Sequence, residues 1–145
     1  MKIERKTHNR YFPVHKTCTH LLQFGTIGFK NKNYQRITQL EINTIEWIIR
    51  KHLKKLVVKK KFKFWKLTNF NRTLTKLNLE SRMGKGKGSI FCKSSLVNPG
   101  TILFEFDNLT IWQARNLAAY LKKKFSIKFS IVSRPNFKIG RETQR

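Results

Sequence analysis

The sequence predicts an α+β fold, an α/β sandwich in which two helices pack on a mostly antiparallel β-sheet, with basic terminal extensions and an extended glycine-lysine loop. Two stretches with apolar residues at helical spacing indicate the helices, and segments that alternate apolar and polar residues indicate the strands. With 145 residues, 39% of them hydrophobic, the chain can bury the core of one domain. We expect a basic arm over residues 1–23, a single domain over 24–133 and a basic tail over 134–145.

A strand is predicted from Leu21 to Phe29, followed by the first helix. Thr38 and Glu41 have the spacing of a capping box, in which each side chain accepts the other residue's backbone N–H, so the helix should begin there. The apolar stripe of this helix comprises Ile42, Ile45, Ile48, Ile49, Leu53 and Leu56. Its opposite side carries Arg50, Lys51, Lys54 and Lys55. Cations near a helix C-terminus suit the helix dipole as well as a phosphate, so both interpretations stay open.

Lysine and phenylalanine alternate from Lys61 to Trp65, which predicts a strand with a buried aromatic face and an exposed basic face. Exposed aromatic residues would instead suit base stacking. Because Phe62 and Phe64 share one face of that strand, core packing is the favoured interpretation. Residues 68–80 have no strong period and should lead into the glycine-lysine loop.

Two further strands are predicted over Ile90–Val97 and Thr101–Asp107. An Asn-Pro-Gly turn separates them, so we expect them to pair as a hairpin. The second helix should run from about Leu109 to Lys124, because Thr110 and Gln113 form another capping-box pattern. The apolar stripe of that helix comprises Ile111, Ala114, Ala118, Leu121 and Phe125. A closing strand is predicted over residues 126–132.

The charge of the chain limits its possible partners. There are 32 lysine and arginine residues against 7 aspartate and glutamate residues, a formal net charge of +25. A nucleic acid, an anionic membrane surface or an acidic protein would neutralise such a surface. No apolar run approaches the roughly 18–20 residues of a membrane span, so none is expected. Basic residues are spread along the whole chain, which favours a nucleic acid.

Few residues are placed to bind a metal or to carry out catalysis. Glu105 and Asp107 would share one face of a strand, but we favour a solvated strand edge facing basic neighbours over a metal pair. Potential zinc ligands gather near the N-terminus: His8, His15, Cys18 and His20. Their spacing matches no structural zinc pattern. We therefore expect no metal, no cofactor and no catalytic residue.

Glycine and lysine alternate in the segment Ser81-Arg82-Met83-Gly84-Lys85-Gly86-Lys87-Gly88-Ser89. The glycines accept positive φ and let backbone N–H groups approach an anion, while the arginine and the lysines supply positive charge. A flexible, solvated surface turn is the alternative interpretation. The segment is not a Walker A loop, because a glycine and not serine or threonine follows Lys87.

From Phe24 to about Ser133 the chain resembles the ribosomal large-subunit protein sixteen family of bacteria and organelles. The resemblance rests on an ordered set of features: Phe24-Gly25, Ile37-Thr38, Lys61 to Trp65, Arg82 to Gly88, Pro99-Gly100, Ile102 to Glu105 and Ala114-Arg115. The Arg-Met-Gly-x-Gly-Lys-Gly element is the most specific of these. Residues 1–23 are less basic than the usual arm of the family, and Val57 to Asn78 diverges strongly.

The resemblance implies a structural constituent of the large ribosomal subunit. Such a protein binds large-subunit rRNA and helps position tRNA in the aminoacyl and peptidyl sites near the peptidyl transferase centre, supporting translation and subunit assembly. It is not an enzyme, because peptide transfer in the ribosome is RNA chemistry. The implied partners are large-subunit rRNA, tRNA and neighbouring large-subunit proteins, with no homo-oligomer.

Two sets of contact residues are expected on this basis. The loop that contacts tRNA and rRNA comprises Arg82, Met83, Gly84, Lys85, Gly86, Lys87, Gly88 and Ser89. The residues expected to bind rRNA elsewhere are basic: Lys2, Arg5, Lys6, Arg10, Lys16, Arg50, Lys51, Lys54, Lys55, Lys61, Lys63, Lys66 and Arg72.

The composition bears on where the protein acts. Lysine, asparagine, phenylalanine and isoleucine, which have A- and T-rich codons, are plentiful, whereas alanine occurs only three times. Together with the divergence of residues 57–78, this favours an organelle-encoded protein of the mitochondrial ribosome over one of bacterial cytoplasm or plastids. A transient RNA-processing or splicing factor of an organelle is the alternative function. A metal-dependent nuclease would need a carboxylate cluster that the chain barely contains.

Overall fold

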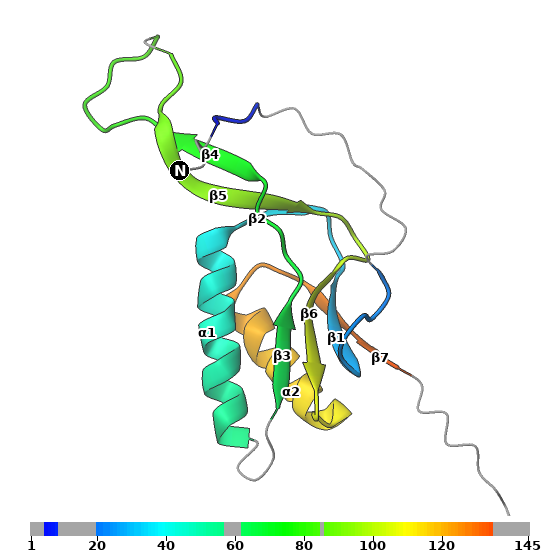
Figure 1. Ribbon diagram of the computed structural model, residues 1–145. Coiled ribbons are helices and arrows are strands. Elements are labelled where there is room, and N and C mark those ends of the chain that lie inside the picture. The colour runs from blue at the N-terminus through cyan, green and yellow to red at the C-terminus, as the bar shows by residue number, and fades with distance from the viewer. Residues whose placement is uncertain (1–4, 9–19, 57–61, 85, 135–145) are drawn as a thin grey trace, which may run out of the picture.

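The structure is a computed structural model that describes residues 5–8, 20–56, 62–84 and 86–134. Within these ranges the chain forms two helices and seven strands in two antiparallel sheets, which confirms the α+β class (Figure 1). In chain order the elements are β1 (Ile27–Asn31), β2 (Gln35–Thr38), α1 (Gln39–Leu56), β3 (Lys63–Lys66), β4 (Arg72–Lys76), β5 (Ser89–Val97), β6 (Ile102–Asp107), α2 (Ile111–Lys124) and β7 (Phe129–Ser133).

The strands are divided between a four-stranded sheet of order β3-β6-β1-β7 and a three-stranded sheet of order β2-β5-β4. The predicted hairpin between residues 90–97 and 101–107 is therefore wrong: β5 pairs with β2 and β4, whereas β6 pairs with β1 and β3. The turn between them is held by β1 instead. Gly100 donates its N–H to the Asn31 carbonyl at 2.8 Å, and Asn31 donates to the Thr101 carbonyl at 2.8 Å.

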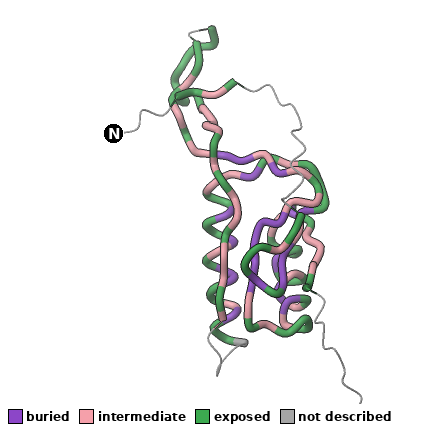
Figure 2. The backbone as a smooth tube through the Cα atoms, turned by 45° about the vertical axis from the view of Figure 1, so that its right-hand side comes forward, coloured by how far each residue is buried: buried purple, intermediate pink, exposed green. Residues whose placement is uncertain are grey.

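One apolar cluster joins the four-stranded sheet to both helices. Phe29, Phe104 and Phe106 form its aromatic centre, with Phe29 and Phe106 at 4.8 Å between ring centroids. Figure 2 shows the buried residues along the inner strands and on one side of α1. Phe62 and Phe64 pack against this cluster while Lys63 is exposed, so the predicted aromatic and basic faces of that strand are confirmed.

Both predicted capping boxes are present. The Thr38 N–H donates to Glu41 Oε2 at 2.8 Å, and the Glu41 N–H donates to Thr38 Oγ1 at 3.2 Å. Thr110 and Gln113 make the same reciprocal pair at the start of α2. These bonds satisfy backbone N–H groups that have no partner inside the helix, and they place both helix starts where the sequence predicts them.

The apolar stripe of α1 is confirmed where its side chains are described, from Ile42 to Leu53. The stripe of α2 needs a correction. Its fully buried residues are Ala114, Leu117 and Leu121, whereas Ile111 is 48% exposed. Ile111 is the first residue of the helix and lies at the end of the stripe, where the core ends.

The sequence pattern did not predict the strands β2 and β4, and it placed the start of β1 too early in the chain. β4 has the polar sequence Arg-Thr-Leu-Thr-Lys, and β2 contributes only Ile37 to the core, so neither has the apolar alternation that indicates a strand. Both are edge strands of the three-stranded sheet. The strand predicted from residue 21 begins only at Ile27.

Glu105 contradicts the prediction of a solvated strand edge. It lies on the inner strand β6 and is fully buried. Its carboxylate accepts the backbone N–H groups of Gln23, Phe24 and Gly25 at 2.9, 2.6 and 2.7 Å. The peptide donors come from a bend in the chain that no residue pattern predicts. They supply the hydrogen bonds that a buried charge requires.

Candidate nucleic-acid interface

The glycine-lysine segment lies in the connection between β4 and β5, which extends away from the helices (Figure 1). Gly84 and Gly86 have φ of 93° and 85°, in the region that glycine adopts without strain. Gly88 has another role, because a Cβ added there would collide with the backbone of Lys76. Two glycines therefore shape the turn of the loop, and the third lets its return strand pass close to β4.

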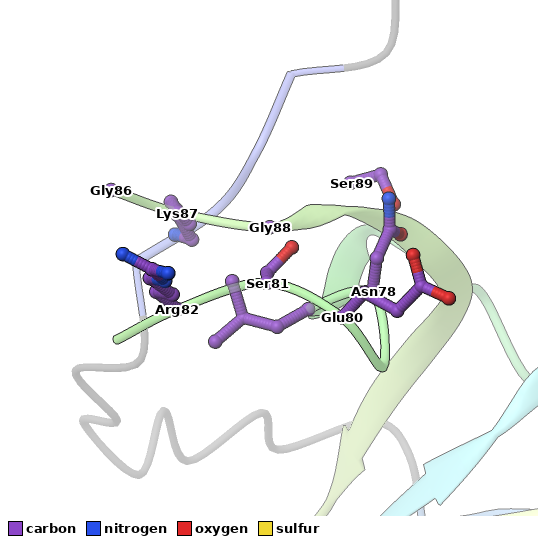
Figure 3. A pocket seen from close by; sticks show the side chains of 9 residues that line it. Asn78, Glu80, Ser81, Arg82, Gly86, Lys87, Gly88 and Ser89 are labelled. Atoms are coloured by element: carbon purple, nitrogen blue, oxygen red, sulfur yellow. The ribbon is translucent and has the colours of Figure 1, made fainter. Parts of the chain in front are cut away.

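The two sides of this loop enclose an open hollow of about 440 Å³. Its lining residues are Leu77, Asn78, Glu80, Ser81, Arg82, Gly86, Lys87, Gly88 and Ser89. Figure 3 shows Arg82 and Lys87 close together at the outer end of the hollow, with Glu80 nearer to the strands. The outer end therefore presents positive charge together with glycine backbone.

Two apolar side chains project from the same loop. Met83 is 96% exposed and Leu79 is 98% exposed. Exposed apolar side chains beside cations suit contact with the faces of bases or sugars, whereas the cations suit phosphates. The loop thus carries groups for both parts of a nucleotide.

The N-terminal segment 5–8 packs against β4 and reaches this loop. Thr7 and Thr73 exchange hydrogen bonds: the Thr7 N–H donates to Thr73 Oγ1 at 3.0 Å, and the Thr73 N–H donates to Thr7 Oγ1 at 3.0 Å. Lys6 Nζ donates to the Lys87 carbonyl at 2.9 Å, and Lys87 Nζ donates to the Thr7 carbonyl. The arm and the loop, predicted as separate contact regions, form one surface here.

Nothing in the sequence predicts that Thr7 pairs with Thr73. The two residues are 66 positions apart, and neither belongs to a motif. Each hydroxyl accepts one peptide N–H and donates to a peptide carbonyl, Thr7 to Thr73 at 3.1 Å and Thr73 to Arg5 at 3.0 Å. Such a pair depends on the course of the backbone, which residue types alone do not determine.

A second basic group surrounds Glu46 on α1. The Glu46 carboxylate accepts hydrogen bonds from Arg50 at 2.9 Å and from Lys66 at 3.2 Å. Partial burial alone would raise the pKa of Glu46, but the hydrogen bonds from Arg50 and Lys66 and their positive charge outweigh it and leave that pKa below its ordinary value. These two cations are thus partly neutralised by a residue that the sequence analysis had not singled out.

The structure separates the predicted contact residues into two groups. Arg82 and Lys87 belong to the loop, and Lys6 contacts it. Arg5 contacts Thr73 on β4, and Arg72 begins that strand, at the end away from the loop. The others described lie on α1 and β3: Arg50, Lys51, Lys54, Lys55, Lys63 and Lys66. Five predicted residues lie outside the described ranges: Lys2, Arg10, Lys16, Lys61 and Lys85.

Two other features are absent from the described part of the chain, a metal cluster and a membrane-spanning helix. It contains no cluster of three or more His, Cys, Asp or Glu side chains placed to hold a metal ion. His15 and Cys18 of the potential zinc group lie outside it. None of its helices combines the length and the apolar character needed to cross a membrane.

Comparison with known proteins identifies the family. The family model described as ribosomal protein L16p/L10e matches residues 1–132. The chain is 42% identical over 137 residues to the large ribosomal subunit protein uL16m of Chondrus crispus, a match that covers 94% of this chain and 99% of that protein. It is 30% identical over 118 residues to the large ribosomal subunit protein uL16 of Buchnera aphidicola subsp. Cinara cedri (strain Cc), covering 81% and 83%. Because both the family model and the similarity to uL16m extend over almost the whole sequence, the chain belongs to the ribosomal protein L16p/L10e family.

Proposed function

We propose that the protein is a structural constituent of the large ribosomal subunit that binds large-subunit rRNA and helps position tRNA in the aminoacyl and peptidyl sites near the peptidyl transferase centre. It would thereby support translation and subunit assembly. The observation that carries the proposal is the joint surface of arm and loop, where Lys6 and Lys87 link a glycine-lined loop to segment 5–8 in a member of this family. The proposed role is binding and positioning, without a catalytic step.

The loop surface has the chemistry for close contact with RNA. Glycine backbone at Gly84 and Gly86 leaves room for a phosphate to approach the peptide N–H groups, and Arg82 adds a charge-assisted hydrogen-bond donor. Met83, almost fully exposed, supplies an apolar contact for a base or a sugar. These groups together would hold an RNA strand by its backbone, which fixes position more than sequence preference.

We propose that the remaining predicted cations bind rRNA on other faces. Lys51, Lys54, Lys55 and Lys63 are exposed and can each neutralise a phosphate. Arg50 and Lys66 would contribute less, because Glu46 already accepts hydrogen bonds from both. The proposed partners besides rRNA and tRNA are the neighbouring proteins of the large subunit.

We place this activity in the mitochondrion. The similarity to uL16m over 94% of the chain supports that location, as do the A- and T-rich codon preferences of its composition. The same composition supports synthesis inside the organelle. Bacterial cytoplasm and plastids are the competing locations.

Sedimentation of the protein in a native organellar lysate tests the main proposal, first with Mg²⁺ present and then with Mg²⁺ chelated to separate the subunits. The expected result is that the protein follows large-subunit RNA in both gradients at about one copy per particle. A protein that stays at the top of the gradient, or that follows other RNAs, would indicate a transient RNA-processing or splicing factor instead.

The role of the loop needs a separate test on reconstituted large subunits. The double variant Arg82→Ala/Lys87→Ala should enter the particle but reduce tRNA binding and peptide synthesis, whereas Lys128→Ala, an exposed lysine near β7, should leave both unchanged. Circular dichroism checks that the double variant is folded, since Lys87 also bonds to Thr7. Normal peptide synthesis by the folded double variant would contradict the assignment of the loop.

A further inference from the structure

A second hollow, of about 210 Å³, lies between the C-terminal half of α1 and the C-terminal half of α2. The residues that give it its chemistry are Trp47, Lys51, His52 and Lys55 of α1 with Tyr120 and Lys124 of α2. Figure 1 shows these helices well separated from the loop between β4 and β5. The hollow is therefore distinct from the arm and loop surface.

Aromatic rings form the walls of this α1–α2 hollow. Trp47 is 60% exposed, and the rings of His52 and Tyr120 lie 5.1 Å apart between centroids. An amphipathic helix that packs on a sheet by one stripe has no structural need for a large, exposed ring on its outer side. Exposed flat rings are, however, what a single-stranded nucleic acid stacks on.

Cations surround these rings. Lys51 Nζ lies 4.8 Å from the ring centroid of Trp47, and Lys124 Nζ lies 5.0 Å from that of Tyr120. A hydrogen bond from Lys124 lowers the pKa of Tyr120. Desolvation opposes this, but the charges of Lys124, Lys51 and Lys55 add to the lowering and leave the pKa below its ordinary value. The positive charge at the mouth of the hollow therefore favours an anionic ligand.

The helix dipole accounts for only part of this arrangement. Lysines in the last turn of a helix are expected, and Lys55 and Lys124 are such residues. Lys51 lies one turn earlier in α1, so the helix dipole does not account for its position over the ring of Trp47. An acidic peptide would be held by the lysines alone, whereas the combination of lysines with accessible rings matches a ligand that has both an anionic backbone and planar groups.

We propose that the α1–α2 hollow is a second RNA site, which takes an unpaired nucleotide by stacking its base on the aromatic walls and holding its phosphate with Lys51, Lys55 and Lys124. The inference rests on the proposed RNA binding for the class of its ligand, and it adds a separate site with a preference for single strands. A base-paired duplex keeps its bases stacked inside and offers this hollow only phosphates.

Tryptophan fluorescence provides a direct measurement. The chain has three tryptophans, so Trp65→Phe and Trp112→Phe together leave Trp47 as the only one. Titration with the hexanucleotide U6 should quench this fluorescence, and a hairpin duplex of equal phosphate content should quench it much less. Equal quenching by the duplex would overturn the single-strand preference. Quenching by poly-glutamate but not by U6 would overturn the proposal in favour of an acidic protein partner.

Substitution in the full chain separates this site from the loop. In salt that weakens the other contacts, Trp47→Ala should reduce affinity for U6 by about 5- to 150-fold, the effect of losing one base–aromatic stack. The matched control is Trp112→Ala, because Trp112 is 66% exposed on α2 but does not line the hollow. Equal effects of the two alanine variants would overturn the proposal.

Two further variants distinguish a loss of ligand contacts from a loss of the folded structure. Trp47→Phe keeps a ring and should retain most of the affinity for U6, whereas Lys51→Ala/Lys124→Ala should reduce affinity without touching the ring of Trp47. If the Phe variant binds as weakly as the Ala variant, the stacking role is wrong. If Trp47→Ala binds U6 normally while the protein still follows large-subunit RNA in gradients, this inference fails and the proposed function stands.

Discussion

At the scale of single residues, the buried carboxylate of Glu105 is the clearest test of what holds the fold together. Replacing it as Glu105→Gln leaves one oxygen for three peptide N–H groups and turns an NH₂ group toward donors. We expect a loss of about 1.5–3 kcal/mol in the free energy of unfolding, measured by urea denaturation. Asp107→Asn, on the same strand but half-buried, should change it by less than about 0.5 kcal/mol. Similar losses in both variants would mean that the peptide donors are not what stabilises Glu105.

Gly25, one of the three residues that donate to Glu105, lies where a side chain would not fit. A Cβ at Gly25 would lie 2.5 Å from the Phe106 carbonyl oxygen, so the bend that presents its N–H to Glu105 needs glycine there. The Phe24-Gly25 pair that supports the family resemblance therefore has a physical role in the structure. Its role depends on strand β6, which lies about 80 residues further along the chain.

At the scale of elements, the correction on α2 predicts two different outcomes for two residues that the sequence pattern treats alike. Leu121→Ala should lower the free energy of unfolding by about 2–5 kcal/mol, because Leu121 is fully buried and its truncation leaves a cavity. Ile111→Ala should cost less than about 1 kcal/mol, since Ile111 is half exposed. Urea denaturation of both variants measures the difference, and equal losses would show that Ile111 belongs to the core.

The two ion pairs of Glu46, one within α1 to Arg50 and one to Lys66 on β3, make stability depend on pH. Because the pKa of Glu46 is lower in the folded chain than its ordinary value of 4.5, Glu46 contributes stability above that value and loses the contribution as pH falls through the folded pKa. The contribution should be below about 1 kcal/mol, as for other exposed pairs. Glu46→Gln should therefore be less stable than the wild type at pH 7 and equal to it at strongly acidic pH. The exposed Glu80→Gln controls for the general effect of removing a negative charge, and a gap that persists in acid would contradict the role of Glu46.

At the scale of the whole molecule, the net charge of +25 predicts steep salt dependence of RNA binding. If about 6–10 phosphates are neutralised, affinity for a large-subunit rRNA fragment should fall by about 10³- to 10⁵-fold between about 50 and 200 mM salt. Arg82→Ala/Lys87→Ala should flatten the plot of log K against log salt by roughly 1.4–1.8, and Lys54→Ala by roughly half as much. Filter binding over a salt series measures both slopes. An unchanged slope in the double variant would mean that the loop makes no phosphate contact.

Local patterns predicted much of this protein correctly. The capping boxes at Thr38 and Thr110, the helical stripe from Ile42 and the aromatic face at Phe62 and Phe64 depend on residues two to four positions apart. At that distance the geometry of a helix or a strand already determines which side chains meet. The polar edge strands β2 and β4 were not predicted, because each buries too few apolar residues to produce a period of alternating apolar and polar residues.

The amino-acid order thus suffices for the α+β class, for the helix starts and for a basic chain with a glycine-lysine segment. Packing between distant segments settled the rest: the assignment of β5 and β6 to different sheets, the burial of Glu105, the contact of Thr7 with Thr73 and the α1–α2 hollow. The physical reason is that these contacts join separate segments of the chain, with partners up to 82 positions apart, or lie between two helices. Their geometry is set when the sheets and helices bury one shared apolar cluster, and no local period of the sequence encodes it.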